Sequence, residues 1–210
     1  VHNPVDVDAF APEGPSEDLL SRVKVVCVSW STNPFKGASS VYRVASSNPE
    51  VTFFLCGRYP NAPALPNLKT LGVINRQRLP MILRSCDAML TFSKNEACPN
   101  HVLEAMASGL PVIYGDTGAM AEIIGDSGAE VTVDTFAPTL QEVLTHRREY
   151  SDRARRRAVE FHHPQKIFGR YHQLIKDALG APSRVPTLER LRRARLDPFR
   201  HPIRYFQAFD

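Results

Sequence analysis

Between Val23 and Val133 the sequence repeats one unit, in which a short apolar run is followed by a turn and an amphipathic stretch. Most of the apolar runs are continuous and rich in Val, Ile or Phe. Continuous runs of this length are typical of strands covered on both faces, as in parallel sheets. The six predicted strands are Val23–Val28, Val51–Cys56, Leu68–Ile74, Ala88–Phe92, Pro111–Tyr114 and Glu130–Val133.

Helix candidates separate these strands, and one of them carries apolar residues at helical spacing from Leu79 to Cys86. Alternating strands and helices predict an α/β fold, a Rossmann-like doubly wound parallel sheet. Ligands of such sheets bind beyond the carboxyl ends of the strands, so we expect functional residues in the loops that lead from strand to helix. The helix candidates are Ala38–Ser46, Arg78–Ser85, Val102–Ala107 and Met120–Ile124.

Beyond Thr135 the pattern changes to helices alone, predicted at Leu140–Glu149, Ser151–Phe161, Lys166–Leu179 and, as a short basic helix, Leu188–Leu196. Residues 1–146 hold ten Lys or Arg and fifteen Asp or Glu, whereas residues 147–210 hold sixteen and seven, so the basic character belongs to the C-terminal segment. We therefore predict an entry or linker segment at residues 1–22, one α/β domain at 23–180 and a basic tail at 181–210.

Composition and cysteine spacing narrow the class of protein. The 210 residues suffice for one sizeable core, and no stretch has the pattern of a signal peptide or of a membrane span. No cysteines form a C-x-x-C pair, and Cys27, Cys56 and Cys86 lie in or beside apolar runs, which indicates reduced core thiols instead of disulfides or a zinc site. We expect a cytoplasmic protein and, because the sequence starts without methionine, a fragment or a processed product.

The loop after the first strand, Ser29–Gly37, has no G-x-G-x-x-G fingerprint, which argues against a dinucleotide-binding oxidoreductase.

The more informative stretch is Ser93–Ile113, in which Glu96 follows a strand and Glu104 lies about one turn into the next helix. Two carboxylates so placed can face one cleft and accept hydrogen bonds from sugar hydroxyls, while amides at the helix start can receive a phosphate. The alternative is a pair of solvated glutamates stabilised by the helix dipole.

The segment EACPNHVLEAMASGLPVI resembles the E-x7-E motif of retaining GT-B glycosyltransferases, most closely family 4. The resemblance covers about residues 1–175 and implies that the chain is the donor-binding half of a GT-B fold. It gives Glu96 the contact with the donor sugar and Glu104 the contact with the nucleotide ribose. It also identifies Asn3–Phe10 as the interdomain linker and Gly118–Glu122 as the family's glycine-rich turn, with Glu122 a helix-start carboxylate.

Further residues match the family at appropriate distances. Lys36-Gly37 looks like the pair whose lysine binds the donor diphosphate and neutralises the leaving group, which makes Lys36 catalytic together with Glu96. Val73 and Ile74 lie where the family packs the nucleotide base, and a core role is the alternative. The predicted donor site also includes the residues between the two glutamates, Asn100, His101, Val102 and Leu103; His101 could instead be a helix-start histidine without such a role.

One departure concerns the family's arginine five residues before the lysine, which is Ser31 here. The variant Ser29–Gly37 resembles a branch that acts on lipopolysaccharide or other cell-surface glycans. Arg58, after the second strand, is a candidate for the missing cation because a guanidinium binds a diphosphate in bidentate fashion, although a solvent-facing arginine fits equally well.

The resemblance implies a hexosyltransferase that moves a sugar from a nucleoside-diphosphate sugar to a glycan or lipid-linked acceptor without a metal or other cofactor, and that is inactive without an N-terminal acceptor domain. A 2-epimerase of sugar nucleotides on the same architecture is one alternative. A second is a binding module whose basic tail contacts an anionic membrane or a protein partner, and we expect no nucleic acid partner. The nucleotide base, the sugar, the acceptor and the oligomeric state are not readable from this sequence.

Overall fold

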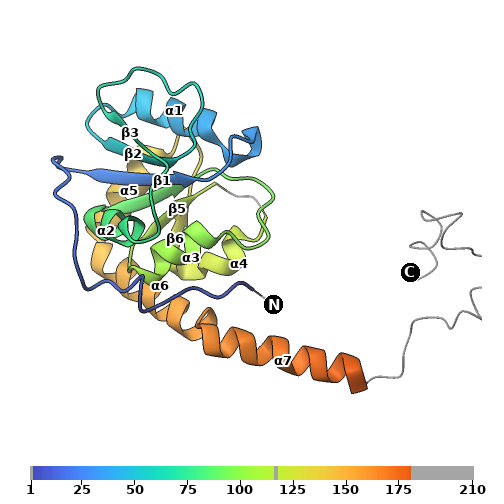
Figure 1. Ribbon diagram of the computed structural model, residues 1–210. Coiled ribbons are helices and arrows are strands. Elements are labelled where there is room, and N and C mark those ends of the chain that lie inside the picture. The colour runs from blue at the N-terminus through green and yellow to red at the C-terminus, as the bar shows by residue number, and fades with distance from the viewer. Residues whose placement is uncertain (1, 116–117, 181–210) are drawn as a thin grey trace, which may run out of the picture. The chain divides into compact units, whose positions relative to one another are not determined.

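The computed structural model describes residues 2–115 and 118–180. Within them lies a six-stranded, all-parallel sheet with the strand order β3-β2-β1-β4-β5-β6, as the alternating pattern predicted (Figure 1). The chain winds outward from β1 in one direction and then, from β4, in the other, which is the doubly wound arrangement. The strands are β1 Lys24–Ser29, β2 Thr52–Gly57, β3 Leu68–Gly72, β4 Ala88–Thr91, β5 Val112–Tyr114 and β6 Gly128–Glu130.

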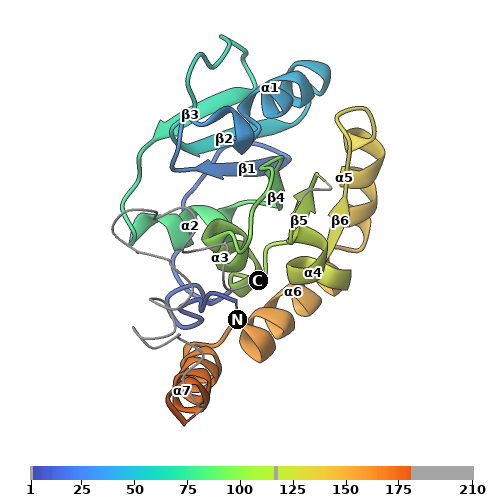
Figure 2. The same ribbon diagram turned by 90° about the vertical axis from the view of Figure 1, so that its right-hand side faces the viewer.

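Helices cover both faces of the sheet. Figure 2 shows α1 and α5 on one face and α2, α3 and α6 on the other. The α-helices are α1 Ala38–Ser47, α2 Arg78–Ser85, α3 Asn100–Ala107, α4 Met120–Ile124, α5 Phe136–Thr145, α6 Arg147–Phe161 and α7 Pro164–Gly180, and two 3-10 turns are η1 Pro34–Lys36 and η2 Gly125–Ser127.

The core consists of two layers, one on each face of the sheet. On the first face, α2, α3 and α4 pack against residues such as Val26 and Met89. On the second, α1 and α5 pack against residues such as Phe53 and Ile113, and the rings of Phe53 and Phe136 meet at a tilt with a centroid distance of 5.6 Å. Cys27, Cys56 and Cys86 are buried free thiols, as the apolar runs predicted.

The N-terminal segment packs along the sheet's first face. Val5, Val7 and Phe10 are buried in that core layer. The guanidinium of Arg84 donates to the carbonyl oxygens of Ala11 and Pro15, at 3.0 and 2.7 Å. This segment is therefore held by the domain over much of its length.

Several predicted bounds differ from the structure. β3 ends at Gly72 and not at Ile74, and α6 begins at Arg147 and not at Ser151. β6 is Gly128–Glu130 and not Glu130–Val133, because the backbone that pairs with β5 starts at Gly128, directly after η2. α5 is Phe136–Thr145 and not Leu140–Glu149. Reciprocal bonds between the backbone amides and hydroxyls of Thr132 and Thr135 close a turn ahead of the helix, and the first helical turn tolerates Pro138.

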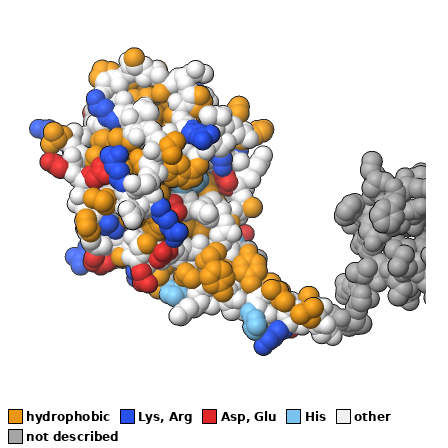
Figure 3. Space-filling model, in the orientation of Figure 1, with side chains coloured by type: hydrophobic (Ala, Val, Ile, Leu, Met, Phe, Trp, Pro, Cys, Tyr) orange, Lys and Arg blue, Asp and Glu red, His pale blue; other side chains and the backbone are white. Residues whose placement is uncertain are grey.

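The described residues end with α7. A first compact unit of the chain extends to Phe168 and a second begins at Gly169. The predicted basic helix Leu188–Leu196 and the tail 181–210 lie outside the described residues. On the face shown in Figure 3, acidic and basic side chains of the body are intermingled and not separated by sign. No described helix combines the length and apolarity that crossing a bilayer requires.

Candidate functional site

The site lies where the strand order reverses. β1 and β4 are neighbours in the sheet, yet β1 leads to α1 on one face and β4 leads to α3 on the other. The loops after the two strands therefore diverge and leave a crevice at the carboxyl edge, which is the usual ligand position in open α/β sheets.

The loop after β1 presents Lys36. The side chain of Asn33 accepts the amide of Phe35 at 2.9 Å and starts the turn η1, which ends at Lys36. Gly37 follows with φ 75°, and a Cβ there would lie 2.4 Å from the carbonyl oxygen of Phe92. Only glycine combines this backbone conformation with so close an approach, so the loop is fixed against the end of β4.

The loop after β4 presents Glu96. Asn95 adopts a left-handed conformation with φ 56° and turns the chain just before it. The backbone of Glu96 is supported from a later segment, because the amide of Ala119 donates to its carbonyl oxygen at 3.0 Å. A Cβ on Gly118 would lie 2.7 Å from that same oxygen, so the predicted glycine-rich turn packs directly on Glu96.

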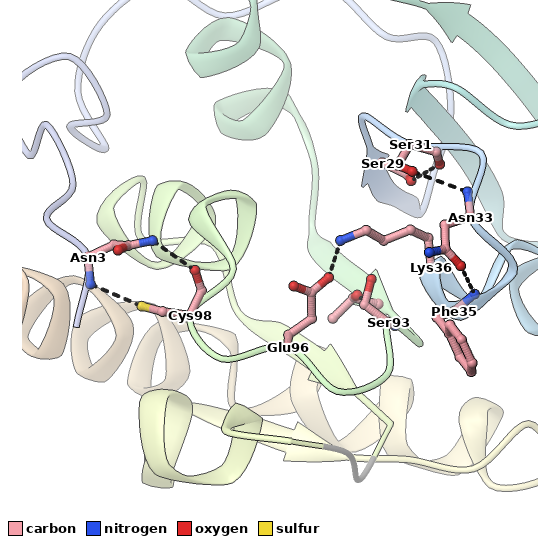
Figure 4. Close-up of polar contacts among 10 residues, drawn as sticks. Asn3, Ser29, Ser31, Asn33, Phe35, Lys36, Ser93, Glu96 and Cys98 are labelled. Carbon is pink, nitrogen blue, oxygen red and sulfur yellow. Dashed lines mark hydrogen bonds and ion pairs between the residues drawn. The ribbon is translucent and has the colours of Figure 1, made fainter. Parts of the chain in front are cut away.

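The two loops meet through Lys36 and Glu96. Nζ of Lys36 contacts Oε1 of Glu96, as Figure 4 shows, and the side chains are 29% and 17% exposed. Without a ligand, each charge of this partly buried pair is neutralised by the other.

α3 begins between the two predicted glutamates. Pro99 is its N-cap, and its carbonyl accepts the amides of Val102 and Leu103. Among the described residues, the amides of Asn100 and His101 have no hydrogen-bond partner. These two amides can therefore receive a phosphate, whereas Val102 and Leu103 have engaged amides and side chains buried in the core.

His101 lies in the first turn of α3 and is buried. Its Nε2 has no partner among the described residues. Desolvation by burial lowers the pKa of His101 to about 4, opposed by the nearby carboxylate of Glu96 and reinforced by Lys36. The ring is neutral at physiological pH and can donate or accept one hydrogen bond there.

Glu104 follows one turn later on the same side of the helix. Its Oε2 is buried without a partner in the described part of the chain. Desolvation raises the pKa of Glu104 to about 7, although the positive charge of Arg76 opposes the shift. A buried carboxylate that keeps an acceptor unused is suited to a ligand that donates hydrogen bonds, such as a hydroxyl.

Two hollows of about 320–330 Å³ share Glu104 and Arg76. One reaches the N-terminal segment, where Asp6 pairs with Arg76 at 3.4 Å. The other is lined by Trp30 and by the predicted base-packing residues Val73 and Ile74. The structure thus brings these two together with Glu104.

Trp30, Arg76 and Asp6 are additions that motif reasoning missed. Trp30 directly follows β1, and Arg76 lies two positions after Ile74. Their place beyond the carboxyl ends of β1 and β3 was a usable signal, but nothing local distinguishes them from ordinary surface residues.

Asn3 ties the N-terminal segment to this site. Its side-chain Nδ2 donates to the carbonyl oxygen of Cys98 at 3.1 Å, and its backbone amide donates to Sγ of Cys98 (Figure 4). Nδ2 also donates to Oδ1 of Asn100 at 2.9 Å. The segment predicted as a linker therefore contacts the loop that follows Glu96.

Arg58 and Ser31 are not brought together by any contact. The backbone amide of Arg58 donates to the carbonyl of Ser29 at 2.7 Å, and its side chain is exposed without a partner among the described residues. The Oγ of Ser31 accepts the amide of Asn33 and serves the turn. Arg58 thus stays a candidate cation.

The described residues contain no cluster of three or more His, Cys, Asp or Glu side chains placed to hold a metal ion. Two cations lie beside the predicted glutamates: Lys36 contacts Glu96, and Arg76 lines both hollows with Glu104.

Comparison with known proteins gives a family for this arrangement. Residues 25–146 match the family described as glycosyl transferases group 1. The chain is similar to the MMP α-(1→4)-mannosyltransferase of Mycolicibacterium hassiacum, with 26% identity over 74% of this chain and 42% of the relative.

Solved structures share the fold. Sucrose-phosphate synthase from Thermosynechococcus elongatus superposes with a TM-score of 0.73 at 18% identity, over 86% of this chain and 52% of that one. HepE of Anabaena in complex with UDP-glucose superposes with a TM-score of 0.70 at 15% identity, over 84% and 57%. The chain thus spans about half the length of the proteins it matches, and its sheet is the Rossmann-like layer of GT-B glycosyltransferases.

Proposed function

We propose, because this chain belongs to the glycosyl transferases group 1 family, that it forms the donor-binding half of a retaining glycosyltransferase of family 4. The donor is a nucleoside-diphosphate sugar, and a hexosyl group is transferred to a glycan or lipid-linked acceptor. The acceptor is held by a second, N-terminal domain. Within the family, the loop Ser29–Gly37 favours a branch that builds cell-surface glycans such as lipopolysaccharide.

One observation carries the proposal: the start of α3 holds four unsatisfied polar groups. They are Nε2 of His101, Oε2 of Glu104 and the amides of Asn100 and His101. Nε2 of His101 and Oε2 of Glu104 are buried. Unsatisfied buried polar groups destabilise a fold, so these two are explained by a ligand that supplies their partners. The two amides are open donors of the first helical turn. Two amides at a helix N-terminus suit a phosphate, and a carboxylate one turn later suits a ribose hydroxyl.

The remaining roles follow from the Lys36–Glu96 contact. The donor diphosphate draws the ammonium of Lys36 toward itself, which leaves Glu96 free to accept hydrogen bonds from the donor sugar. The pair is thus a preformed contact that the ligand replaces with contacts of its own. Lys36 then stabilises the negative charge that develops on the leaving diphosphate.

Retention of configuration is proposed to proceed by front-face displacement. The bond between the anomeric carbon and the diphosphate oxygen breaks, while the acceptor oxygen bonds to the same carbon from the same face. The acceptor proton passes to the departing diphosphate. The chain's contribution is to hold the donor and to stabilise the leaving group with Lys36 and the amides of α3, without a metal ion.

The length of the chain limits what it does alone. Since it spans about half of the proteins it matches, we expect donor binding and little or no transfer. We place the enzyme in the cytoplasm, where nucleotide sugars serve as donors, with peripheral membrane contact through residues 181–210.

Isothermal titration of the purified chain with UDP, GDP and ADP tests the donor site. The best binder is then repeated with Lys36→Ala and Glu104→Ala, and with two matched controls, Lys69→Ala and Glu50→Ala, whose side chains are exposed away from the crevice. We expect one nucleotide to bind selectively, to be weakened about tenfold by each site variant, and to be unaffected by the controls. EDTA should leave the affinity unchanged.

Three outcomes would count against parts of the proposal. No binding at millimolar nucleotide, or equal effects of site and control variants, would remove the donor site. Robust transfer by this chain alone would contradict the need for an acceptor domain. Incubation with the donor alone that yields an epimerised sugar nucleotide would favour the 2-epimerase instead.

A further inference from the structure

The hollow that contains Glu104 also contains the chain's only tryptophan. It has a volume of about 320 Å³ and lies at the carboxyl edge, between the end of β1, the segment from β3 to α2, and α3. Its lining includes Trp30, Val73, Ile74 and Arg76 besides Glu104. Neither Lys36 nor Glu96 lines this hollow, so it belongs to another part of the ligand than the reacting sugar.

The indole of Trp30 lies close to Gly57 and is partly exposed to solvent. Its side chain is 43% exposed, which is unusual for the largest apolar side chain. A Cβ on Gly57, at the end of β2, would lie 3.2 Å from Cε3 of the indole and 1.9 Å from the carbonyl oxygen of Ser29. The missing side chain at Gly57, where φ is 104°, therefore lets the ring lie close to the backbone between the two strands.

The hollow combines two kinds of surface. An exposed indole and the side chains of Val73 and Ile74 offer apolar area, and Glu104 offers an unused buried acceptor. A planar group that stacks on the indole, joined to a hydroxyl-bearing group that reaches Glu104, would satisfy both. A nucleoside has this composition, because its base is planar and aromatic and its ribose carries adjacent hydroxyls.

The position along α3 gives the orientation. Glu104 lies one turn beyond the free amides of Asn100 and His101, and it shares its hollow with Trp30, whereas Asn100 and His101 do not line that hollow. A base at Trp30, a ribose at Glu104 and a diphosphate at the start of α3 then follow in covalent order.

We infer that Trp30 is the stacking platform for the nucleobase of the donor and a determinant of nucleotide affinity. This inference rests on the proposed donor site but can fail while that site stands. Stacking is tolerant of base identity, because every base has an aromatic face. Trp30 therefore sets the strength of binding, and the hydrogen-bonding edge of the base is read elsewhere in the hollow.

The single tryptophan makes the test direct, since all indole emission comes from this position. The chain is titrated with UDP, GDP and ADP, and separately with pyrophosphate and ribose 5-phosphate, while the emission spectrum is followed. We expect the nucleotide that binds to change the emission intensity or maximum. Pyrophosphate and ribose 5-phosphate, which lack a base, should leave the emission unchanged.

Substitutions supply the second measurement. By calorimetry, Trp30→Ala should weaken the best nucleotide by about 5- to 100-fold, whereas Trp30→Phe, which keeps an aromatic ring, should recover most of the affinity. Pyrophosphate should bind both variants as it binds the wild type. Phe35→Ala is the matched control, because Phe35 is 59% exposed on the same loop but does not line the hollow.

The outcomes separate the two proposals. If a nucleotide binds and Glu104→Ala weakens it, but the emission is unchanged and Trp30→Ala binds normally, the stacking role is overturned and the donor site stands. If pyrophosphate alone reproduces the emission change, Trp30 responds to the diphosphate and stacking is overturned as well. If no nucleotide binds the wild type, both proposals fail. Should Trp30→Ala not fold, Trp30→Phe and the emission titration decide.

Discussion

Lys36 and Glu96 are 60 residues apart in the chain, and their side chains meet in an ion pair across the point where the sheet reverses its strand order. Each is held there by a glycine that packs against backbone, Gly37 on Phe92 and Gly118 on Glu96. The contact between opposite charges is thus imposed by the two loops and not by the flexibility of the side chains.

A double-mutant cycle measures this contact. Lys36→Met or Glu96→Gln alone leaves one partly buried charge without its partner, whereas the double variant removes both. We expect a coupling of about 1 kcal/mol in the free energy of unfolding by urea, which decreases at high salt. Additivity of the two single effects within about 0.3 kcal/mol would show that the pair contributes nothing to stability.

Gly37 and Gly72 provide a second, matched comparison. Their φ values are 75° and 69°, but a Cβ on Gly37 meets the backbone at 2.4 Å whereas one on Gly72 has nothing within 4 Å. Gly72→Ala should cost about 1 kcal/mol for its left-handed conformation alone. Gly37→Ala should cost at least about 2 kcal/mol and also weaken nucleotide binding by displacing Lys36. If Gly37→Ala and Gly72→Ala lose the same free energy of unfolding in urea, the loop at Gly37 moves to accommodate the added Cβ.

The sequence predicts most of the strands and helices. Apolar runs such as Ala88–Phe92 are buried on both faces, and therefore their pattern carries the strand assignment. The edge strand β6 lacks that pattern, since Gly128 and Ala129 are defined by pairing with β5, and its position was predicted wrongly. Local composition cannot report a pairing partner.

The residues of the candidate site also fall into two groups, those that a motif identifies and those that only the fold brings together. Lys36, Glu96 and Glu104 lie in motifs whose spacing is visible in one dimension. Trp30 and Arg76 acquire their place only when the ends of β1 and β3 and the helix α3 come together around one hollow. An exposed aromatic or basic residue has no periodic signature, so motif spacing selects neither of them.

His101 predicts how acid destabilises the protein. Its pKa is lowered by burial to about 4 from an ordinary value of 6.5. Because the folded-state pKa is depressed, the stability that depends on a neutral ring is complete above pH 6.5 and is lost as the pH falls toward 4. Between pH 7 and pH 4, the wild type should lose up to about 3 kcal/mol more than His101→Leu.

Urea unfolding across this range checks the difference, with His146→Gln as the control, since His146 is exposed at the junction of α5 and α6. The control should follow the wild type. If His101→Leu loses as much free energy of unfolding between pH 7 and pH 4 as the wild type, the acid sensitivity comes from another titrating group.

For Glu104 we expect the opposite dependence on pH, with a free energy of unfolding that decreases as the pH rises. Burial raises its pKa from 4.5 to about 7. A raised folded-state pKa means that the stability of the protonated form is fully present below pH 4.5 and is lost as the pH rises through 7. Glu104→Gln keeps the shape of the protonated group at every pH. The variant should therefore match the wild type near pH 4.5 and exceed its free energy of unfolding by about 2 kcal/mol at pH 8, with allowance for the exposed part of the side chain.

The same substitution should harm the ligand site, because a carboxylate accepts hydrogen bonds from hydroxyls more strongly than an amide does. The affinity of the wild type for its nucleotide should rise between pH 6 and pH 8 relative to Glu104→Gln, and at pH 8 the variant should bind about tenfold more weakly. Titration of the phosphates affects both proteins alike and cancels in the ratio. A more stable variant with weaker binding would show that the fold tolerates an unpartnered carboxylate because the ligand needs it, whereas a stable variant with unchanged binding would separate Glu104 from the ribose.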